Sequence, residues 1–379
     1  MAKVYDCVII GGGVVGCATA YYLAKKGLKV LLCEKKYLCA GATGRCGGGI
    51  RQQWSTEGNT LLAMASRKIF ENLSEELETD IDYVQGGYLI LAYTDEEAER
   101  FKKNVEMQKR LGLEVEYLSP EEAKKIVPFL NLEGVKSATF CPTDGHANPF
   151  KVTYGYAEAA KRLGAEIMVD TEVIGIKVKK GRVESVLTNR GEFITANVVN
   201  ASGGSARIIA QMVGIDIPCT PYRHEIFVTE PLNPLFDTMV ISFDGNFYFR
   251  QAKDGGIMGG QGTPDEKPGE NLRSSFKFFK DFGNKLRRLL PTLGDVKIVR
   301  HWAGLYTMTP DAQPIIGGVD EVSGFYQAVG FSGHGFMVAP VTAKILSQIV
   351  AGEEPEMSLK SFSYKRFKGK IEIKEKSVV

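Results

Sequence analysis

The first fifty residues alternate short apolar runs with glycine-rich turns. Residues 4–10 (VYDCVII) form an apolar run that predicts a buried strand, and GGGVVG follows at once. Residues 14–26 have a helical pattern, and residues 30–33 predict a second buried strand. This order of elements predicts a β–α–β unit with a glycine-rich first turn.

The turn between the first strand and the helix carries G-x-G-x-x-G at Gly11, Gly13 and Gly16. Gly11 permits the tight turn, Gly13 lets the backbone approach a pyrophosphate, and Gly16 lets the helix pack closely on the strand. The free N–H groups and the dipole of the helix N-terminus favour a phosphate there. Val14 and Val15, which open the helix, are therefore candidate cofactor contacts as well.

An acid closes the second strand. Glu34 follows the first glycine by about 20 residues, which is where dinucleotide-binding units place the residue that binds the ribose. A carboxylate there accepts hydrogen bonds from a ribose diol and repels a 2′-phosphate, so NADP is disfavoured. Lys35 is a further candidate contact. The unit by itself leaves NAD and FAD open.

Strand-like and helical runs alternate in two later stretches, residues 86–139 and 214–299. The strand-like runs are 88–94, 224–230, 239–243, 247–252 and 256–261, and the helical runs are 95–111 and 272–290. This mixture predicts a substrate domain with an antiparallel-rich sheet. A closing helix is predicted over residues 341–351.

Composition excludes several classes of protein. The 379 residues are 44% hydrophobic, which excludes a disordered chain. The net charge of +2 predicts no bulk attraction to nucleic acid or to an anionic membrane. Seven cysteines without a CxxC pair predict a reduced, cytoplasmic protein with no metal site. The first apolar run is too short for a signal peptide or an integral membrane span.

A second glycine-rich stretch, residues 41–54 (GATGRCGGGIRQQW), favours FAD, because NAD units usually continue into a helix at this point. The stretch resembles the D-amino-acid oxidase superfamily of flavoproteins, especially its sarcosine oxidase-like branch. In that branch the loop covers the FAD pyrophosphate and reaches the isoalloxazine. The resemblance implies that Thr43 and Arg45 contact the pyrophosphate and that nearby backbone passes close to the ring. The loop's candidate contacts are Ala42, Thr43, Arg45, Gly47, Gly48 and Gly49.

Three more segments resemble that family. Residues 171–176 (TEVIGI) match a strand that contacts the adenine, and residues 197–204 (NVVNASGG) match a segment that returns to the dinucleotide. Residues 306–340 match the closing strand and loop, in which GFSGHGF lines the flavin and a helix dipole stabilises its anionic reduced form. A purely structural role is the alternative for the histidine of that loop. The implied contacts are Val173, Ala201, Gly203, Gly330, Gly333, His334, Gly335 and Met337.

The resemblance implies an α/β fold with a discontinuous Rossmann-like FAD-binding domain of the GR2 type and an antiparallel-rich α+β substrate domain. The FAD domain is expected to comprise residues 1–85, 140–213 and 300–365, and the substrate domain residues 86–139 and 214–299. The charged tail, residues 366–379, is either a solvated terminus or a contact with a partner subunit.

An amino-acid substrate needs a fixed cation for its carboxylate. Arg51 directly follows the glycine-rich loop and matches the arginine that sarcosine oxidase-type enzymes use, and a guanidinium binds a carboxylate bidentately. A pyrophosphate-binding or surface arginine is the alternative. Tyr248 and Arg250 alternate on one predicted strand and His224 opens another, so each of them could lie over the ring. His146 is expected in a loop.

Two residues depart from the monomeric sarcosine oxidases. Gly304 stands where those enzymes attach FAD through a cysteine, so the resemblance implies non-covalent FAD. Met337 stands where they carry a lysine, so the pocket is expected to be less cationic and more apolar.

The pattern as a whole resembles the β subunits of heterotetrameric sarcosine oxidases and of archaeal dye-linked L-proline dehydrogenases, and we favour the second. It implies FAD-dependent oxidation of a secondary amino acid, above all L-proline to 1-pyrroline-5-carboxylate. The chain would be the catalytic subunit of a hetero-oligomer with a second flavoprotein or electron-transfer subunit, and an FMN at the interface is a further implication. A peroxide-forming sarcosine or glycine oxidase, a flavoprotein with structural FAD, and an NAD dehydrogenase are the alternatives.

Overall fold

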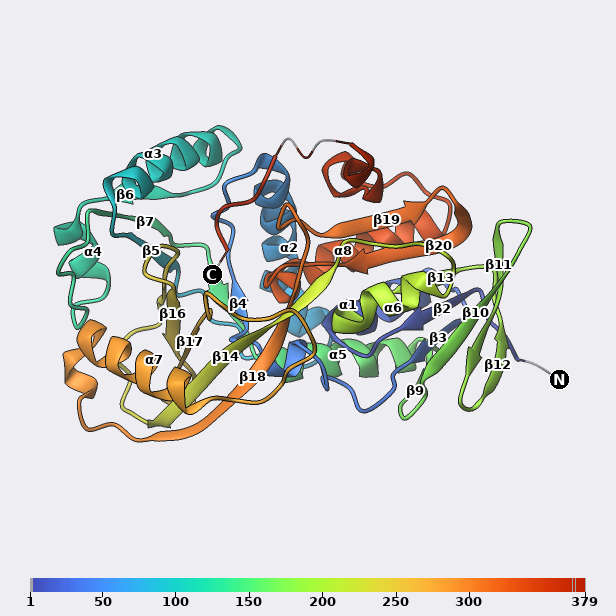
Figure 1. Ribbon diagram of the computed structural model, residues 1–379, viewed down its shortest axis with the longest axis horizontal. Coiled ribbons are helices and arrows are strands. Elements are labelled where there is room, and N and C mark those ends of the chain that lie inside the picture. The colour runs from blue at the N-terminus through green and yellow to red at the C-terminus, as the bar shows by residue number, and fades with distance from the viewer. Residues whose placement is uncertain (1–2, 370, 372, 379) are drawn as a thin grey trace.

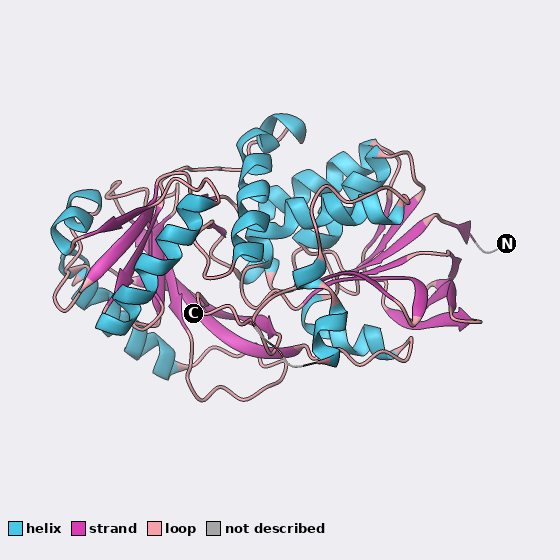
Figure 2. Cartoon of the chain, turned by 90° about the horizontal axis from the view of Figure 1, so that it is seen from above, coloured by secondary structure: helices cyan, strands magenta, loops and turns pink. Residues whose placement is uncertain are grey.

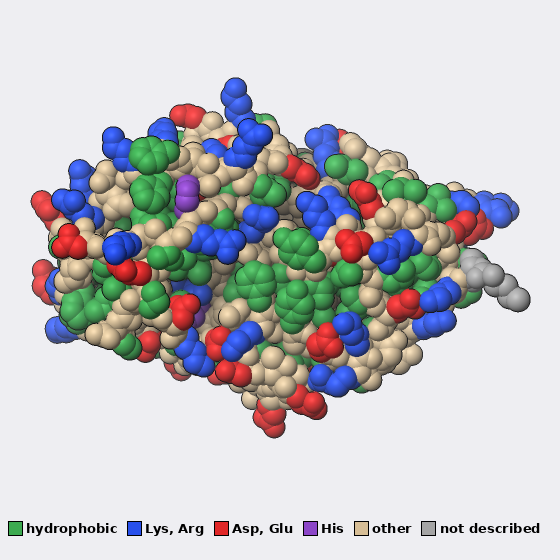
Figure 3. Space-filling view, turned by 90° about the horizontal axis from the view of Figure 1, so that it is seen from below, with side chains coloured by type: hydrophobic (Ala, Val, Ile, Leu, Met, Phe, Trp, Pro, Cys, Tyr) green, Lys and Arg blue, Asp and Glu red, His purple; other side chains and the backbone are tan. Residues whose placement is uncertain are grey.

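The computed structural model describes residues 3–369, 371 and 373–378. Two sheets lie side by side along the long axis of the molecule (Figure 1). The nearly balanced charge is visible on one face, where positive and negative side chains are interspersed (Figure 3).

The first sheet has a parallel centre. Its order is β9-β3-β2-β13-β20, and every neighbouring pair in that run is parallel. Strands β2, β3 and β13 are buried throughout, as expected when helices or other layers cover a parallel sheet on both faces. The predicted β–α–β unit is confirmed by β2, α1 and β3. The bounds are β2 Cys7–Ile10, α1 Val14–Lys25, β3 Val30–Cys33, β9 Glu166–Met168, β13 Val198–Asn200 and β20 Val322–Val329.

An antiparallel ribbon extends this sheet beyond β20. Strand β11 pairs with β10 and β12 in antiparallel fashion and touches β20, while β1 pairs with β12 and β19 pairs with β20. The bounds are β1 Lys3–Val4, β10 Val173–Lys179, β11 Arg182–Thr188, β12 Gly191–Ile194 and β19 Ile315–Val319.

Helices gather on one side of the first sheet (Figure 2). Helix α1 is buried from Val14 to Ala24 and packs against α5 (Pro149–Arg162) and α8 (Gly335–Val350), and α8 also packs on α2 (Glu57–Glu76). The closing helix, predicted to start at Val341, in fact begins at Gly335 and includes Pro340. The proline removes one backbone hydrogen bond, and the helix tolerates this loss because most of its residues are buried.

The second sheet has the order β18-β14-β17-β16-β15-β5-β7-β6 in the described residues. All its neighbours are antiparallel except β15 and β5, which are parallel. This confirms the antiparallel-rich second sheet. The bounds are β5 Tyr88–Ala92, β6 Glu116–Leu118, β7 Ser137–Cys141, β14 Thr220–Pro231, β15 Met239–Ser242, β16 Phe247–Gln251, β17 Gly256–Gln261 and β18 Ile298–Met308.

The two faces of the second sheet carry different apolar clusters, because successive side chains of a strand point to opposite faces. Leu89 belongs to the cluster that packs on α7 (Phe276–Leu289) and α4 (Pro120–Ile126). Tyr88 belongs to the opposite cluster, which includes Phe101 of α3 (Asp95–Arg110). That second face is the one that contributes to the candidate site.

A short pair, β4 (Gly49–Ile50) with β8 (Gly145–His146), joins the glycine-rich loop to the chain before α5. His146 therefore lies in a strand, and the expectation of a loop was wrong, because His146 and Gly145 are the residues that pair with β4. The predicted domain boundaries stay a prediction. Both β7 and β18 belong wholly to the second sheet, so boundaries drawn by sheet membership fall after Cys141 and Met308.

All seven cysteines are free thiols, and all except Cys46 are buried. Burial raises the pKa of Cys33 and Cys219 to about 12 and that of Cys46 to about 11. Among the helices of the described residues, none has the length and apolar character needed to span a membrane. Within the same residues, no cluster of histidines, cysteines and acids is arranged to hold a metal ion.

Candidate active site

A cavity of about 340 Å³ lies at the carboxyl ends of the parallel strands. Gly11, Glu34, Ala201 and Gly330 each directly follow one of these strands, and all four line the cavity. Open parallel sheets bind ligands at this edge, because the loops that leave neighbouring strands meet there. The sheet topology therefore brings together residues from four distant parts of the chain.

The N-terminus of α1 opens into this cavity. Its N-cap residue, Gly13, provides no side-chain cap, so the N–H groups of Val15 and Gly16 in the first turn are available to an anion. The Val14 N–H donates to Thr43 Oγ1 at 3.1 Å, which joins the first glycine turn to the second loop. A Cβ on Gly16 would stand 1.9 Å from the Gly11 carbonyl oxygen. Gly16 does not line the cavity, and its role is the close packing that was predicted.

Glu34 is held in the wall by two backbone groups. Its Oε2 accepts from the Gly12 N–H at 2.7 Å, and its Oε1 accepts from the Lys36 N–H at 2.8 Å. A carboxylate keeps further lone pairs after two such bonds, so it can also accept from a ribose diol. Lys35 lies at the cavity as well, and its ammonium donates to Ser205 Oγ at 3.1 Å.

The second glycine-rich loop separates this cavity from a neighbouring one. Arg45 donates through Nη1 to the Ala303 carbonyl at 3.1 Å, and Arg250 donates through Nε to the Gly47 carbonyl at 2.7 Å. A Cβ on Gly49 would stand 1.7 Å from Tyr88 Oη, so only glycine fits there. The loop is therefore fixed by arginines and by close packing on the second sheet.

Arg51 is a buried cation in this cavity, only 4% exposed. Its guanidinium lies 3.8 Å from the centre of the Trp54 ring, and Nη2 donates to the Ser377 carbonyl at 2.6 Å. Nη1 is buried and has no hydrogen-bond partner within the described residues. Burial lowers the pKa of the guanidinium, while Tyr88 and Glu375 act in the opposite direction. A buried cation with an unsatisfied donor is a site for an anion.

Three aromatic rings from the second sheet line another wall. His224 stacks on Tyr306 with 4.2 Å between ring centroids, and on Tyr248 with 5.5 Å. Nε2 of His224 is buried without a hydrogen-bond partner in the described residues, and burial lowers the pKa of the imidazole to about 4. His224 is therefore neutral at pH 7 and can accept a proton or donate one through its ring nitrogens.

His334 occupies the N-cap position of α8, at the part of the cavity that residues 330–337 line. Its ring lies 4.6 Å from that of Trp54, and both ring nitrogens are buried without partners in the described chain. Burial lowers its pKa to about 4. A Cβ on Gly333 would meet the Tyr306 ring at 2.3 Å.

The candidate residues predicted from the sequence line this one cavity except Gly16 and Arg250, and the expectation that Arg250 could lie over the ring was wrong, because it lines a neighbouring cavity. The assignments of these residues to cofactor or substrate stay predictions. Sequence reasoning missed other residues of the lining. Trp54 was in the quoted loop and Tyr306 in the quoted C-terminal block, but neither was given a role. The main residues missed are Trp54, Tyr88, Met239, Tyr306, Ser377 and Val378.

Comparisons with known proteins agree with this geometry. The family of FAD dependent oxidoreductases known as DAO matches residues 6–349. The chain belongs to this family.

Individual relatives of this FAD-dependent oxidoreductase cover almost its whole length. It is 31% identical to the sarcosine oxidase subunit beta of Arthrobacter sp., over 96% of this chain and 91% of that protein. The crystal structure of L-proline dehydrogenase from P. horikoshii superposes with a TM-score of 0.93 at 38% identity, covering 97% of this chain and 99% of that one. Glycine oxidase from Geobacillus kaustophilus gives a TM-score of 0.89 at 28% identity, covering 96% and 99%.

The residues present in this oxidoreductase fit FAD. The uncapped N-terminus of α1 and the glycines around it suit a pyrophosphate, and Glu34 lies where a ribose acid belongs. The unpartnered nitrogens of His224 and His334 line the same cavity and provide polar groups for a ring system or a substrate.

A second cavity of about 390 Å³ lies beside the first and shares Arg45 and Cys46 with it. Its further cations are Arg250, Lys253 and Arg300, and its wall includes the Trp302 ring. Tyr248 and Arg250 are two residues apart on β16, but Tyr248 lines the first cavity and Arg250 lines the second. His146 and Trp302 lie in this second one, and His301 packs on Phe279 at 5.7 Å between rings.

Proposed function

We propose that this chain oxidises a secondary amino acid, L-proline above all, to an imine with non-covalent FAD. The observation that carries the proposal is Arg51, a buried cation whose Nη1 has no hydrogen-bond partner among the described residues, in the cavity that also holds the dinucleotide-binding turn. A guanidinium in this state favours a carboxylate, because the pair forms in a site sheltered from water. For proline, the product is 1-pyrroline-5-carboxylate.

The side chains divide the work of such a reaction. Arg51 binds the carboxylate and so fixes the distance from it to the carbon that is oxidised. The turn at the start of α1 and Glu34 would hold FAD, which would supply the hydride acceptor for the ring carbon next to the nitrogen. Nε2 of His224, which has no hydrogen-bond partner among the described residues, is the lone-pair acceptor for the proton that the substrate nitrogen must lose. Tyr248, Tyr306 and Trp54 exclude water around the ring of the substrate.

The nature of the pocket supports a secondary amine with a hydrocarbon ring. Tyr88, Tyr248 and Met239 form its second-sheet wall, and Met337 lies where a second cation would otherwise stand. Relatives named for proline, sarcosine and glycine oxidation support an amino-acid substrate. The proline dehydrogenase structure has a higher identity and a higher TM-score to this chain than the glycine oxidase structure has.

The test is anaerobic mixing of the purified yellow protein with L-proline, sarcosine or glycine, following the oxidised-flavin absorbance. We expect rapid bleaching by proline and slow or no bleaching by the other two. Bleaching by sarcosine or glycine but not proline would support the oxidase alternative, for which peroxide formation in air is the second readout. A flavin that no amine bleaches would support structural FAD.

Non-covalent attachment is part of the proposal and rests on Gly304, which offers no side chain for a bond to FAD. Denaturation followed by ultrafiltration should release all yellow colour into the filtrate. Colour that stays with the chain would contradict non-covalent FAD.

We further propose a partner subunit that takes the electrons, an FMN at the interface with it, and a cytoplasmic location. Relatives named as a subunit beta support the partner. The second cavity has three arginines and an aromatic wall, beside Lys253 that pairs with Asp82 at 3.1 Å, and its arginines support a phosphate-bearing flavin. Purification of the native complex followed by flavin analysis should give FAD and FMN together. FAD alone in an active complex would contradict the FMN, and cell fractionation tests the location.

A further inference from the structure

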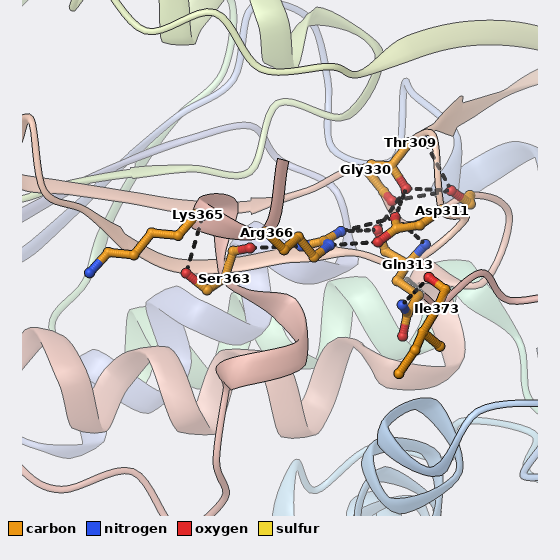
Figure 4. A network of polar contacts seen from close by, with 9 residues as sticks. Thr309, Asp311, Gln313, Gly330, Ser363, Lys365, Arg366 and Ile373 are labelled. Atoms are coloured by element: carbon orange, nitrogen blue, oxygen red, sulfur yellow. Dashed lines mark hydrogen bonds and ion pairs between the residues drawn. The ribbon is translucent and has the colours of Figure 1, made fainter. Parts of the chain in front are cut away.

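The end of the chain returns to the candidate active site. Arg366, in the short helix η5 (Tyr364–Lys368), donates through Nε to Asp311 Oδ2 at 2.6 Å (Figure 4). Further on, the Glu375 N–H donates to the Asp311 carbonyl at 2.9 Å, and Gln313 Nε2 donates to the Ile373 carbonyl at 3.5 Å. Asp311 and its neighbours therefore hold the start of the segment on the FAD-binding half.

Glu375 then fixes the segment at the start of α2. It is only 2% exposed, and its carboxylate accepts hydrogen bonds from four residues. Oε1 accepts from the Ser55 N–H at 3.0 Å, from the Ser55 hydroxyl, and from the Ser377 N–H at 2.9 Å. Oε2 accepts from Thr56 Oγ1 at 2.8 Å and Asn59 Nδ2 at 3.1 Å. These bonds and the helix N-terminus stabilise the anion, and they outweigh the effect of burial, so the pKa of Glu375 is lowered.

The residues after Glu375 enter the cavity. Ser377 and Val378 both line it, and the Ser377 carbonyl accepts from Arg51 Nη2. Lys374 and Lys376 are exposed, while Glu375 and Ser377 are buried, so side chains alternate along this extended stretch. The interpretation of residues 366–379 as a solvated terminus is therefore wrong for Glu375 and Ser377.

We propose that residues 375–378 form one wall of the substrate cavity and that Glu375 is a positioning residue. It fixes the orientation of the Arg51 guanidinium by holding the Ser377 carbonyl in place. This inference rests on the proposed function, in which Arg51 binds the substrate carboxylate. With Nη2 fixed by Ser377 and one face on Trp54, the guanidinium keeps one orientation, and Nη1, which no described residue satisfies, is directed to the substrate.

Two consequences follow for substrate binding. A long side chain that is ordered before binding loses less freedom when the ligand arrives, which corresponds to a gain of up to about tenfold in affinity. Val378 also limits the length of the substrate on that side of the cavity. Loss of the wall should therefore weaken carboxylate binding and admit larger rings.

The experiment compares four forms of the FAD-loaded protein: the unchanged chain, E375Q, a chain that ends at Lys374, and K376A. The probe is pyrrole-2-carboxylate, a ring carboxylate with no saturated carbon to oxidise, and its Kd is read from the flavin spectrum. We expect the Kd to rise about tenfold on truncation and by less in E375Q, since glutamine keeps one acceptor oxygen. K376A changes an exposed side chain of the same segment and should match the unchanged protein.

Steady-state kinetics provide the second readout. We expect the KM for L-proline to rise with kcat nearly unchanged, and the ratio of pipecolate to proline turnover to increase. Flavin content and Tm show whether each variant is folded, and E375Q keeps the test decisive if truncation prevents folding.

Two results would overturn the inference. An unchanged Kd in both E375Q and the truncated chain would show that the segment does not position Arg51. A lower Kd would show that Ser377 competes with the substrate instead. The proposed function is tested separately by R51A: if R51A binds the probe as tightly as the unchanged chain, Arg51 is not the carboxylate site, and the inference falls with it.

Discussion

His224 and Tyr306 lie face to face, with 4.2 Å between their ring centroids and 4° between their planes. They come from β14 and β18, where His224 pairs with Gly304, so Tyr306 is its diagonal neighbour on the same face of the sheet. Tyr248 also stacks on His224, next to Gly260, whose missing side chain leaves room for the tyrosine ring. The imidazole is thus packed against two phenols.

Replacing His224 by phenylalanine keeps a ring in this stack and removes Nε2. We expect H224F to bind FAD normally and to lower kcat/KM for L-proline about 100-fold, the lower range for a lost general base. Stopped-flow flavin reduction measures this directly. Reduction at the unchanged rate would show that His224 only packs.

Removing the guanidinium of Arg51 should raise the KM for an amino acid. A lost charge-assisted contact in a sheltered site costs about 2–5 kcal/mol, so R51A should raise KM about 30-fold or more. R51K keeps the charge but lacks the planar guanidinium, so its KM should lie between those of R51A and the unchanged protein. Methyl esters of the substrate provide the control, since they lack the carboxylate and should discriminate little between R51A and the unchanged protein.

Gly16 should tolerate no side chain. A Cβ there would stand 1.9 Å from the Gly11 carbonyl oxygen, so α1 or the first turn must move. We expect G16A to purify with much less flavin and to lose at least about 1–3 kcal/mol of stability. Gly41, at the same cavity, has nothing within 4 Å of such a Cβ, and G41A should retain its flavin. Equal flavin content in the two variants would contradict this reading of the turn.

Glu97 should make stability depend on pH. It is fully buried on α3, and burial, together with the nearby Asp244, raises its pKa to about 7. The folded chain therefore binds more protons than the unfolded chain between about pH 4.5 and 7, so stability falls as pH rises through this window.

E97Q should abolish that dependence. It should match the unchanged protein at pH 5 and exceed it at pH 8 by up to about 3 kcal/mol. Thermal unfolding at both pH values measures the difference, and E96Q, an exposed neighbour on the same helix, is the control. A constant difference between pH 5 and pH 8 would contradict the raised pKa.

The nucleotide-binding half could be predicted because its signals are local. Gly11 and Gly13 are required by the geometry of one turn, and Glu34 directly follows its own strand. The sequence did not predict helix α2, because its buried face includes the polar residues Asn59, Thr60 and Ser66. These residues interrupt the helical periodicity of apolar positions on which such a prediction depends.

Contacts across the chain could not be predicted in this way. The stack of His224 on Tyr306 depends on the register of β14 against β18. The bond between Glu375 and Ser55 joins residues more than 300 positions apart, and no local pattern marks either partner. Such contacts depend on tertiary packing, which a single sequence does not display.

The buried thiols have a consequence for durability. Hydrogen peroxide, which forms when oxygen takes the electrons of a reduced flavin, attacks thiolates rather than thiols. Cys46 lies in the cavity itself, and its pKa of about 11 keeps the thiol protonated at physiological pH. The raised pKa values of Cys33 and Cys219 keep their thiols protonated as well. In the peroxide-forming alternative, the thiols that line the cavity, Cys33 and Cys46, would therefore be poor targets for sulfenic acid formation.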